Sequence, residues 1–132
     1  YTPAQAQVGL HKLSALDTRL AHRRERAAAY ARLLGDAVEL QSVPAAGAST
    51  YYFLAARIPG GAGAMKRRLL RAGIDSAAGE EVADDCARLL GYDDCPEAAR
   101  AYEEVLALPF YDGIEERIMA RVASVIRKGR KA

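Results

Sequence analysis

The sequence contains few of the side chains that most often carry chemistry at a protein site. Only two histidines and two cysteines occur among its 132 residues. A hydrolytic nucleophile needs a base and an orienting group held beside it. His11 and His22 lie on one expected helix, about three turns apart, so they are too distant to act as a pair. We therefore expect surface or core-edge histidines and no catalytic residue in this chain.

The two cysteines, Cys86 and Cys95, are too few for a disulfide framework and are expected to be reduced thiols in a cytoplasmic protein. Each ends an Asp-Asp-Cys triplet, residues 84–86 and 93–95. A metal site needs three or four convergent ligands, and no histidine lies near these triplets. The pattern favours a polar loop beside a helix, and we expect no metal site.

Long apolar runs are also missing. No stretch of about 18 apolar residues occurs, which excludes a membrane-spanning helix. The N-terminus has neither the basic nor the apolar region of a signal peptide, so we expect a cytoplasmic protein. The chain begins with Tyr rather than Met, which indicates a fragment or a start whose first residues are not included.

Neither sign of charge predominates. Nineteen basic and 17 acidic residues give a net charge of +2, which provides no general attraction to nucleic acid or membranes. Basic residues do cluster at 66–71 and after 127, and a nucleic-acid patch is one interpretation. Acidic residues at 80–85 follow closely, so solvated faces are expected instead.

The glycine-rich turn 59–63 precedes a helix but lacks the Gly-Lys-Ser/Thr of a phosphate-binding loop.

The residues that are present predict one folded domain. Over residues 3–34, apolar side chains recur at spacings of three and four, which predicts a single long amphipathic helix. Thr2 and Pro3 suit its first turn, and Gly35 suits its end. A helix about 45 Å long exceeds what a small domain needs and would suit a spacer between two domains.

The rest of the chain alternates short strands and helices. We expect strands at 38–43, 50–58 and 106–110, a short extended segment from Ile74, and helices at 64–72, 81–90, 96–105 and 114–127. This order predicts an α+β fold with a small, mostly antiparallel sheet of three or four strands and helices packed on one face. We divide it into a linker helix, residues 1–35, and a small domain, residues 36–132.

Several short segments occur in a distinctive order. They are Gln5-Ala6, Gly9-Leu10, Leu16-Asp17, the stretch from Arg23 to Tyr30, the aromatic stretch 51–57, Leu69 to Asp75, Cys95 to Ala98 and Leu108 to Tyr111. In this order they resemble the C-terminal small domain of the DegT/StrS-type sugar aminotransferases, which depend on pyridoxal phosphate (PLP). The resemblance extends over nearly the whole chain.

The resemblance implies a fold-type-I aminotransferase, usually a homodimer, that acts on keto sugars attached to nucleotides and takes its amino group from a donor such as glutamate. In the family an upstream large domain supplies the Schiff-base lysine and most cofactor contacts. Such a lysine needs a partly desolvated pocket, and the settings of Lys12, Lys66, Lys128 and Lys131 offer none. We therefore expect no cofactor on this chain and PLP in the full-length protein.

Four residues are candidates for contact with the substrate: Tyr51, Tyr52, Arg57 and Asp75. The two tyrosines are neighbours in an expected strand and should point to opposite faces of the sheet. The family often has His or Trp in this strand and His or Tyr soon after Gly-Ile. In this chain tyrosines occupy the position in the strand, and the segment 76–79 (Ser-Ala-Ala-Gly) occupies the position after Gly-Ile.

Three functional hypotheses follow. In the first, the chain packs on a large PLP domain and closes one side of its active site. In the second, it is a stand-alone interaction module that dimerises through the long helix, and an exposed apolar face on residues 6–34 would indicate a missing partner. In the third, it is a small basic nucleic-acid binder, whose binding would depend steeply on salt.

Overall fold

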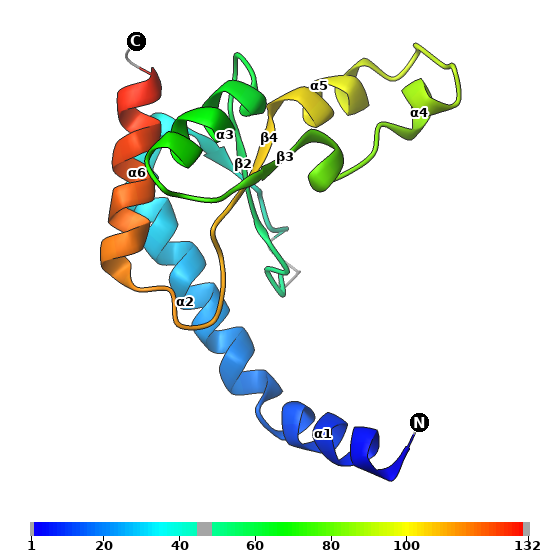
Figure 1. Cartoon of the computed structure of the whole chain (residues 1–132), viewed down its shortest axis with the longest axis vertical. Coiled ribbons are helices and arrows are strands. Elements are labelled where there is room, and N and C mark those ends of the chain that lie inside the picture. The colour runs from blue at the N-terminus through cyan, green and yellow to red at the C-terminus, as the bar shows by residue number, and fades with distance from the viewer. Residues whose placement is uncertain (1, 45–48, 131–132) are drawn as a thin grey trace.

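A computed structural model describes residues 2–44 and 49–130, and these form a small α+β lobe from which one helix projects (Figure 1). The expected α+β class is confirmed. The helices are α1 (Pro3–Ser14), α2 (Leu16–Leu34), α3 (Ala62–Arg71), α4 (Cys86–Leu89), α5 (Pro96–Glu104) and α6 (Glu116–Arg130). The strands are β1 (Glu39–Leu40), β2 (Leu54–Arg57), β3 (Ala77–Ala78) and β4 (Val105–Leu108), and short 3-10 turns span Gly35–Ala37 and Gly79–Glu81.

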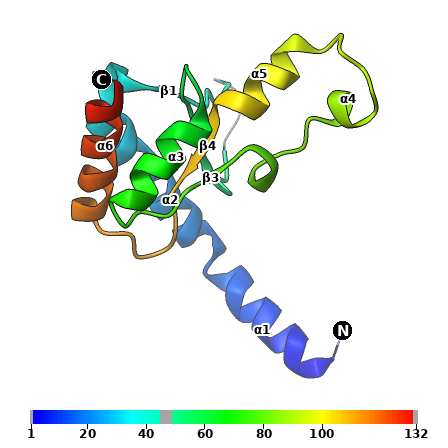
Figure 2. The same ribbon diagram turned by 45° about the horizontal axis from the view of Figure 1, so that its top comes forward.

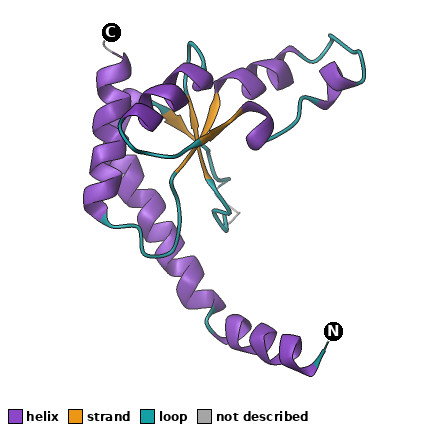
Figure 3. Ribbon diagram, in the orientation of Figure 1, coloured by secondary structure: helices purple, strands orange, loops and turns teal. Residues whose placement is uncertain are grey.

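The four strands form one antiparallel sheet in the order β1-β2-β4-β3 (Figure 3). The central pair is β2 with β4, where Leu54 lies opposite Leu108 and Ala56 opposite Leu106. These four side chains are buried, whereas the alternate residues of both strands are half-buried. The sheet therefore has one core face and one open face.

The core lies between the core face of the sheet and three helices. Among its fully buried side chains are Tyr30 and Leu34 of α2, Leu69 of α3, and Val122 and Ile126 of α6. Close packing of α6 on α3 is visible at Gly129, where an added Cβ would lie 2.8 Å from Cε of Met65. The helices that cover the sheet are thus gathered on one face, as expected.

The expected single helix over residues 3–34 is wrong in one respect, because the chain leaves helical geometry at Ala15, with φ −98° and ψ 0°. The Ser14 hydroxyl donates a hydrogen bond to the carbonyl of His11, a contact that bends helices. The ends are as expected. Thr2 and Gln5 form a capping box before α1, and Gly35 ends α2 at φ +53°.

The expected strand at 50–58 is also shorter than predicted, because only Leu54–Arg57 pairs in the sheet. Tyr51 has φ +45°, a left-handed conformation that cannot continue a strand. Tyr51 and Tyr52 therefore lie outside the strand, and the prediction that they point to opposite faces of the sheet is wrong. The first expected strand is likewise reduced to Glu39–Leu40. The small side chains at 45–49 predict a loop after it, and residues 45–48 lie outside the described residues.

Other boundaries shift by smaller amounts. The helix expected at 81–90 is limited to α4, while α3, α5, α6 and β4 lie within a few residues of their expected positions. The segment from Ile74 pairs only at Ala77–Ala78. Among the described residues, no helix combines the length and apolar character that crossing a bilayer requires.

Helix α1 stands apart from this core. None of its residues is buried, and it extends away from the lobe in two views (Figures 1 and 2). Val8, Leu10 and Leu13 are 54%, 64% and 64% exposed, and Leu16 at the start of α2 is 43% exposed. The apolar stripe predicted on the N-terminal helix is therefore buried only from Ala27 onward, and Leu20 before it is half-buried. A helix of this length has little stability by itself in water and normally gains stability by packing its apolar face on other residues. In this chain the apolar side chains of α1 have no such packing among the described residues.

We predict that Tyr30→Phe lowers the free energy of unfolding by about 1 kcal/mol. The Tyr30 hydroxyl is buried and donates a 2.8 Å hydrogen bond to the carbonyl of Pro109, which joins α2 to the segment after β4. Chemical denaturation would measure the loss. Tyr92→Phe is the matched control, because Tyr92 is 62% exposed, and it should change stability by much less. Equal effects of the two substitutions would contradict the assigned role of this hydrogen bond.

Candidate functional site

The structure does not bring the four sequence-predicted residues together. Arg57 lies at the end of β2 and donates from Nε to Glu104 at 2.6 Å and from Nη1 to Glu39 at 3.4 Å. The carboxylate of Glu104 raises the pKa of Arg57 above its usual value. Its guanidinium is therefore already paired within the lobe.

Asp75 and Tyr52 are isolated in different ways. The exposed carboxylate of Asp75 accepts a 2.9 Å hydrogen bond from the backbone N–H of Ser76, a local turn contact. Ser76 itself is buried, and its Oγ has no hydrogen-bond partner among the described residues. Tyr52 is 83% exposed, and its ring and that of Phe53 meet edge to face with centroids 6.1 Å apart.

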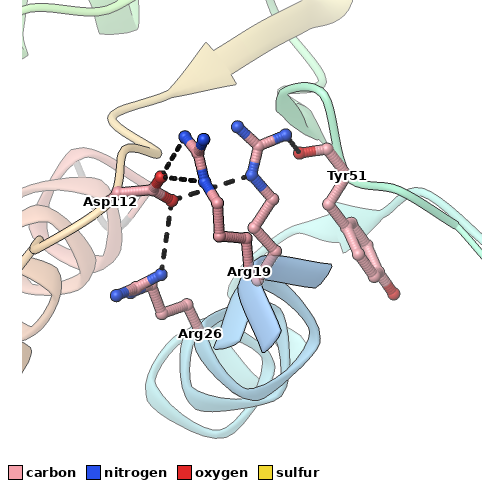
Figure 4. A network of polar contacts seen from close by, with 5 residues as sticks. Arg19, Arg26, Tyr51 and Asp112 are labelled. Atoms are coloured by element: carbon pink, nitrogen blue, oxygen red, sulfur yellow. Dashed lines mark hydrogen bonds and ion pairs between the residues drawn. The ribbon is translucent and has the colours of Figure 1, made fainter. Parts of the chain in front are cut away.

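Tyr51 lies where three distant segments meet. Its ring packs against Phe110, with centroids 6.2 Å apart. Its carbonyl accepts a long hydrogen bond, 3.5 Å, from Nη1 of Arg23 on α2. The chain before β2, the loop after β4 and the first half of α2 therefore meet here (Figure 4).

The backbone of Tyr51 is strained. A left-handed conformation is uncommon for a bulky side chain and costs on the order of 1–3 kcal/mol. The hydroxyl oxygen of Ser49 accepts a 3.0 Å hydrogen bond from the Tyr51 N–H, and Arg23 holds the carbonyl. Contacts on both sides of this residue thus maintain the unusual conformation.

Asp112, in the loop between β4 and α6, is the centre of the polar contacts at this junction. Arg19 donates to its Oδ2 from Nε at 3.0 Å and from Nη2 at 2.6 Å. Arg23 and Arg26 approach Oδ1 at 3.8 and 3.7 Å. We name these four residues the Asp112 cluster (Figure 4). The hydrogen bonds from Arg19, with smaller effects of the other two guanidiniums, lower the pKa of Asp112 below its usual value.

The Asp112 cluster was not among the predicted sites. Arg19, Arg23 and Arg26 are spaced by four and three residues, which places their side chains on one face of a helix, and that spacing was a usable signal. Asp112 lies 93 residues beyond Arg19, and no local pattern connects them. The arginines alone could have been identified, but not their carboxylate partner.

A second feature is an apolar groove of about 490 Å³ on the open face of the sheet. Its floor includes Ala55 and Val105, and its walls include Phe53, Val82 and Tyr102. Polar lining is confined to a few groups such as Gln41 and Asp84. This groove can therefore bury an apolar surface, and its few polar groups lie among apolar neighbours.

The described lysines do not fit a PLP linkage. Lys12 and Lys128 are exposed, and Lys66 forms an ion pair with Glu81, whose pKa this contact lowers. A lysine that attacks PLP must be partly desolvated and free of such a partner.

In the part of the chain that the structure describes, no three His, Cys, Asp or Glu side chains gather to hold a metal ion. Asp85 instead caps α4 by accepting from the N–H of Arg88.

Comparison with known proteins shows a likeness along nearly the whole chain. The model of the DegT/DnrJ/EryC1/StrS aminotransferase family matches residues 2–127. A DegT/DnrJ/EryC1/StrS aminotransferase from Brucella abortus has a similar structure, with a TM-score of 0.80 at 21% identity over 93% of this chain and 34% of that one. No curated protein matches the chain.

Two other similar structures are somewhat nearer in sequence. The aminotransferase TlmJ from Streptoalloteichus hindustanus is 28% identical, with a TM-score of 0.78 over 94% of this chain and 35% of that one. The sugar aminotransferase CalS13 from Micromonospora echinospora is 26% identical, with a TM-score of 0.73 over 92% of this chain and 33% of that one. The chain thus spans about a third of the length of each of these proteins.

We predict that Asp112→Asn destabilises the fold at pH 7 and that the difference from the unchanged chain shrinks in acid. Because folding lowers the pKa of Asp112, its contribution is present above the unfolded value of about 3.9 and is lost as pH falls through the folded value. Unfolding midpoints at pH 7 and at about pH 2 would measure this. Asp93→Asn, in an exposed loop, is the control, and a difference for Asp112→Asn that persists unchanged at low pH would contradict the assignment.

Proposed function

The chain belongs to the DegT/DnrJ/EryC1/StrS aminotransferase family, and from this we propose that it is the small C-terminal lobe of a PLP-dependent aminotransferase that acts on nucleotide-linked keto sugars. The observation that carries the proposal is the family match over residues 2–127, joined to a fold that spans only about a third of similar aminotransferases. The amino donor, for example glutamate, and the sugar would bind mainly to other polypeptide.

In this proposal, bond-making chemistry takes place outside the lobe. PLP stabilises negative charge on a bound amino compound, and the protein supplies binding and orientation. The described lysines are exposed or paired, so none of them has the setting that a PLP lysine needs. The lobe would instead close one side of the active site, position substrate and exclude water.

Two surfaces of the lobe suit contact with the rest of such an enzyme. One is α1 with the start of α2, where Val8, Leu10, Leu13 and Leu16 are exposed. The other is the apolar groove on the open face of the sheet. Burying either surface would gain stability in proportion to the apolar area removed from water. We propose that residues 1–35 form the linker to a large domain and residues 36–132 the small domain, with the buried residues of α2 from Ala27 onward fastening the linker to the core of the lobe.

The candidate substrate contacts change in rank under this proposal. Tyr51 and Tyr52 remain candidates, because they belong to the segment that leads into β2 and Tyr52 is free to meet a ligand. Arg57 is a weaker candidate, since Glu104 and Glu39 already pair its guanidinium. Asp75 is exposed and accepts one hydrogen bond from its neighbour Ser76, so it also remains a candidate. We further propose that the full-length protein is a cytoplasmic homodimer.

The alternative function is an interaction module without catalysis, in which α1 pairs with a second copy of the chain. The same exposed leucines favour it. The two functions differ in what covers α1: a large domain in the first case and another α1 in the second. Self-association of the purified chain therefore distinguishes them.

We expect the isolated chain to bind no PLP at a specific lysine. After incubation with PLP and reduction with borohydride, mass spectrometry should find no lysine labelled stoichiometrically. In a chimera, residues 2–127 would replace the matching third of TlmJ, and that protein should bind PLP through a lysine outside the inserted segment. Stoichiometric labelling of one lysine in the isolated chain would refute the proposal.

We also expect α1 to be the least protected helix of the isolated chain. Its backbone N–H groups should exchange with deuterium much faster than those at 27–34 of α2, because only the latter lie in the core. In the chimera, α1 should become protected. Leu10→Glu with Leu13→Glu should abolish that protection, while Leu70→Glu, at an exposed leucine of α3, should not. Concentration-dependent protection of α1 in the isolated chain would favour the dimerisation module instead.

A further inference from the structure

The Asp112 cluster holds more positive charge than its carboxylate balances. Three guanidiniums face one carboxylate, which leaves a surplus of two positive charges. The surplus does not depend on protonation, because arginine stays charged at any ordinary pH. Asp17 and Glu25 lie on the same helix, but their positions in the 3.6-residue repeat place them on other faces of it. The described residues provide no further acidic partner to these arginines.

Arg26 is the least satisfied of the three. Its side chain is only 20% exposed, yet it makes no side-chain hydrogen bond to any described residue. Its nearest acidic atom, Oδ1 of Asp112, lies 3.7 Å away, beyond hydrogen-bond distance. A largely buried charge without hydrogen bonds is unfavourable, so the guanidinium lacks a partner that its environment calls for.

Arg23 is only slightly better paired. Its side chain is 28% exposed, its approach to Asp112 is 3.8 Å, and its one hydrogen bond, to the Tyr51 carbonyl, is 3.5 Å long. Arg19, by contrast, binds Asp112 with two short bonds and is 45% exposed. The charge of Asp112 is thus taken up mainly by Arg19, and the N–H donors of Arg23 and Arg26 are left for another acceptor.

We propose that Arg23 and Arg26 form a binding site for a phosphate-class dianion beside Asp112. A dianion matches the surplus charge of the cluster. Planar guanidinium groups bind phosphate oxygens through paired N–H donors, and three or more oxygens can satisfy both side chains at once. The site requires only this chain, so it does not depend on the proposed function. Inorganic phosphate and the diphosphate of a nucleotide share the chemistry that it would recognise.

The test is a titration of the 132-residue chain with inorganic phosphate, pyrophosphate and uridine diphosphate in a low-salt buffer without other oxyanions. NMR of the arginine Nε–H groups would locate the site. We expect saturable binding with a Kd on the order of 1 mM or tighter, and shifts confined to the Asp112 cluster. Tighter binding of uridine diphosphate than of pyrophosphate would identify a nucleotide as the source, and equal binding would identify the inorganic anion.

Matched variants separate a built site from general charge attraction. Arg23→Gln and Arg26→Gln should each weaken pyrophosphate binding at least about tenfold, because each removes charge-assisted hydrogen bonds. Arg26→Lys, which keeps the charge but loses the planar fork, should be intermediate. Arg24→Gln removes the same charge from an exposed neighbour and should have little effect. Circular dichroism would verify that each variant is folded.

Three outcomes would overturn the proposal. One is the absence of saturable binding by any of the three anions. Another is equal weakening by Arg24→Gln and Arg26→Gln, which would mean that only net charge matters. The third is a set of shifts that maps to the basic residues of α3 and α6 instead of the Asp112 cluster.

Discussion

The fold depends on one constraint: the sheet has two faces, and the chain supplies helices for only one of them. Alternate residues of β2 and β4 turn four apolar side chains toward α2, α3 and α6, and there the core forms. The opposite face keeps small side chains such as Ala55 and Ala107, bordered by Arg57 and its acidic partners. The apolar groove on the open face follows from that asymmetry.

A second layer of contacts fixes the loops at one end of the sheet. The buried hydroxyl of Tyr30 holds the carbonyl of Pro109, and a few residues later Asp112 meets the arginines of the same helix. On the other side, Arg23 reaches the carbonyl of Tyr51. One helix thus sets the positions of the segment that enters β2 and the segment that leaves β4, although these are far apart in sequence.

How much of this the sequence could predict depended on the range of each interaction. Pro3, Gly35 and Pro96 are local signals, and the helix boundaries that they mark were predicted well. The aromatic stretch from Thr50 suggested a strand, but contacts with Ser49, Arg23 and Phe110 hold Tyr51 in a conformation that no strand allows. Arg23 lies 28 residues before Tyr51, so no local pattern could predict their contact.

The break at Ala15 has a mechanical consequence. No described residue before Ala27 is buried, so the two N-terminal helices can change direction relative to each other without disturbing a single core contact. Rotation at that joint would alter which way the sheet and its loops face, while leaving the lobe internally rigid. A change of angle between α1 and α2 would therefore cost no buried contact of the lobe, because α1 contributes no buried residue to it.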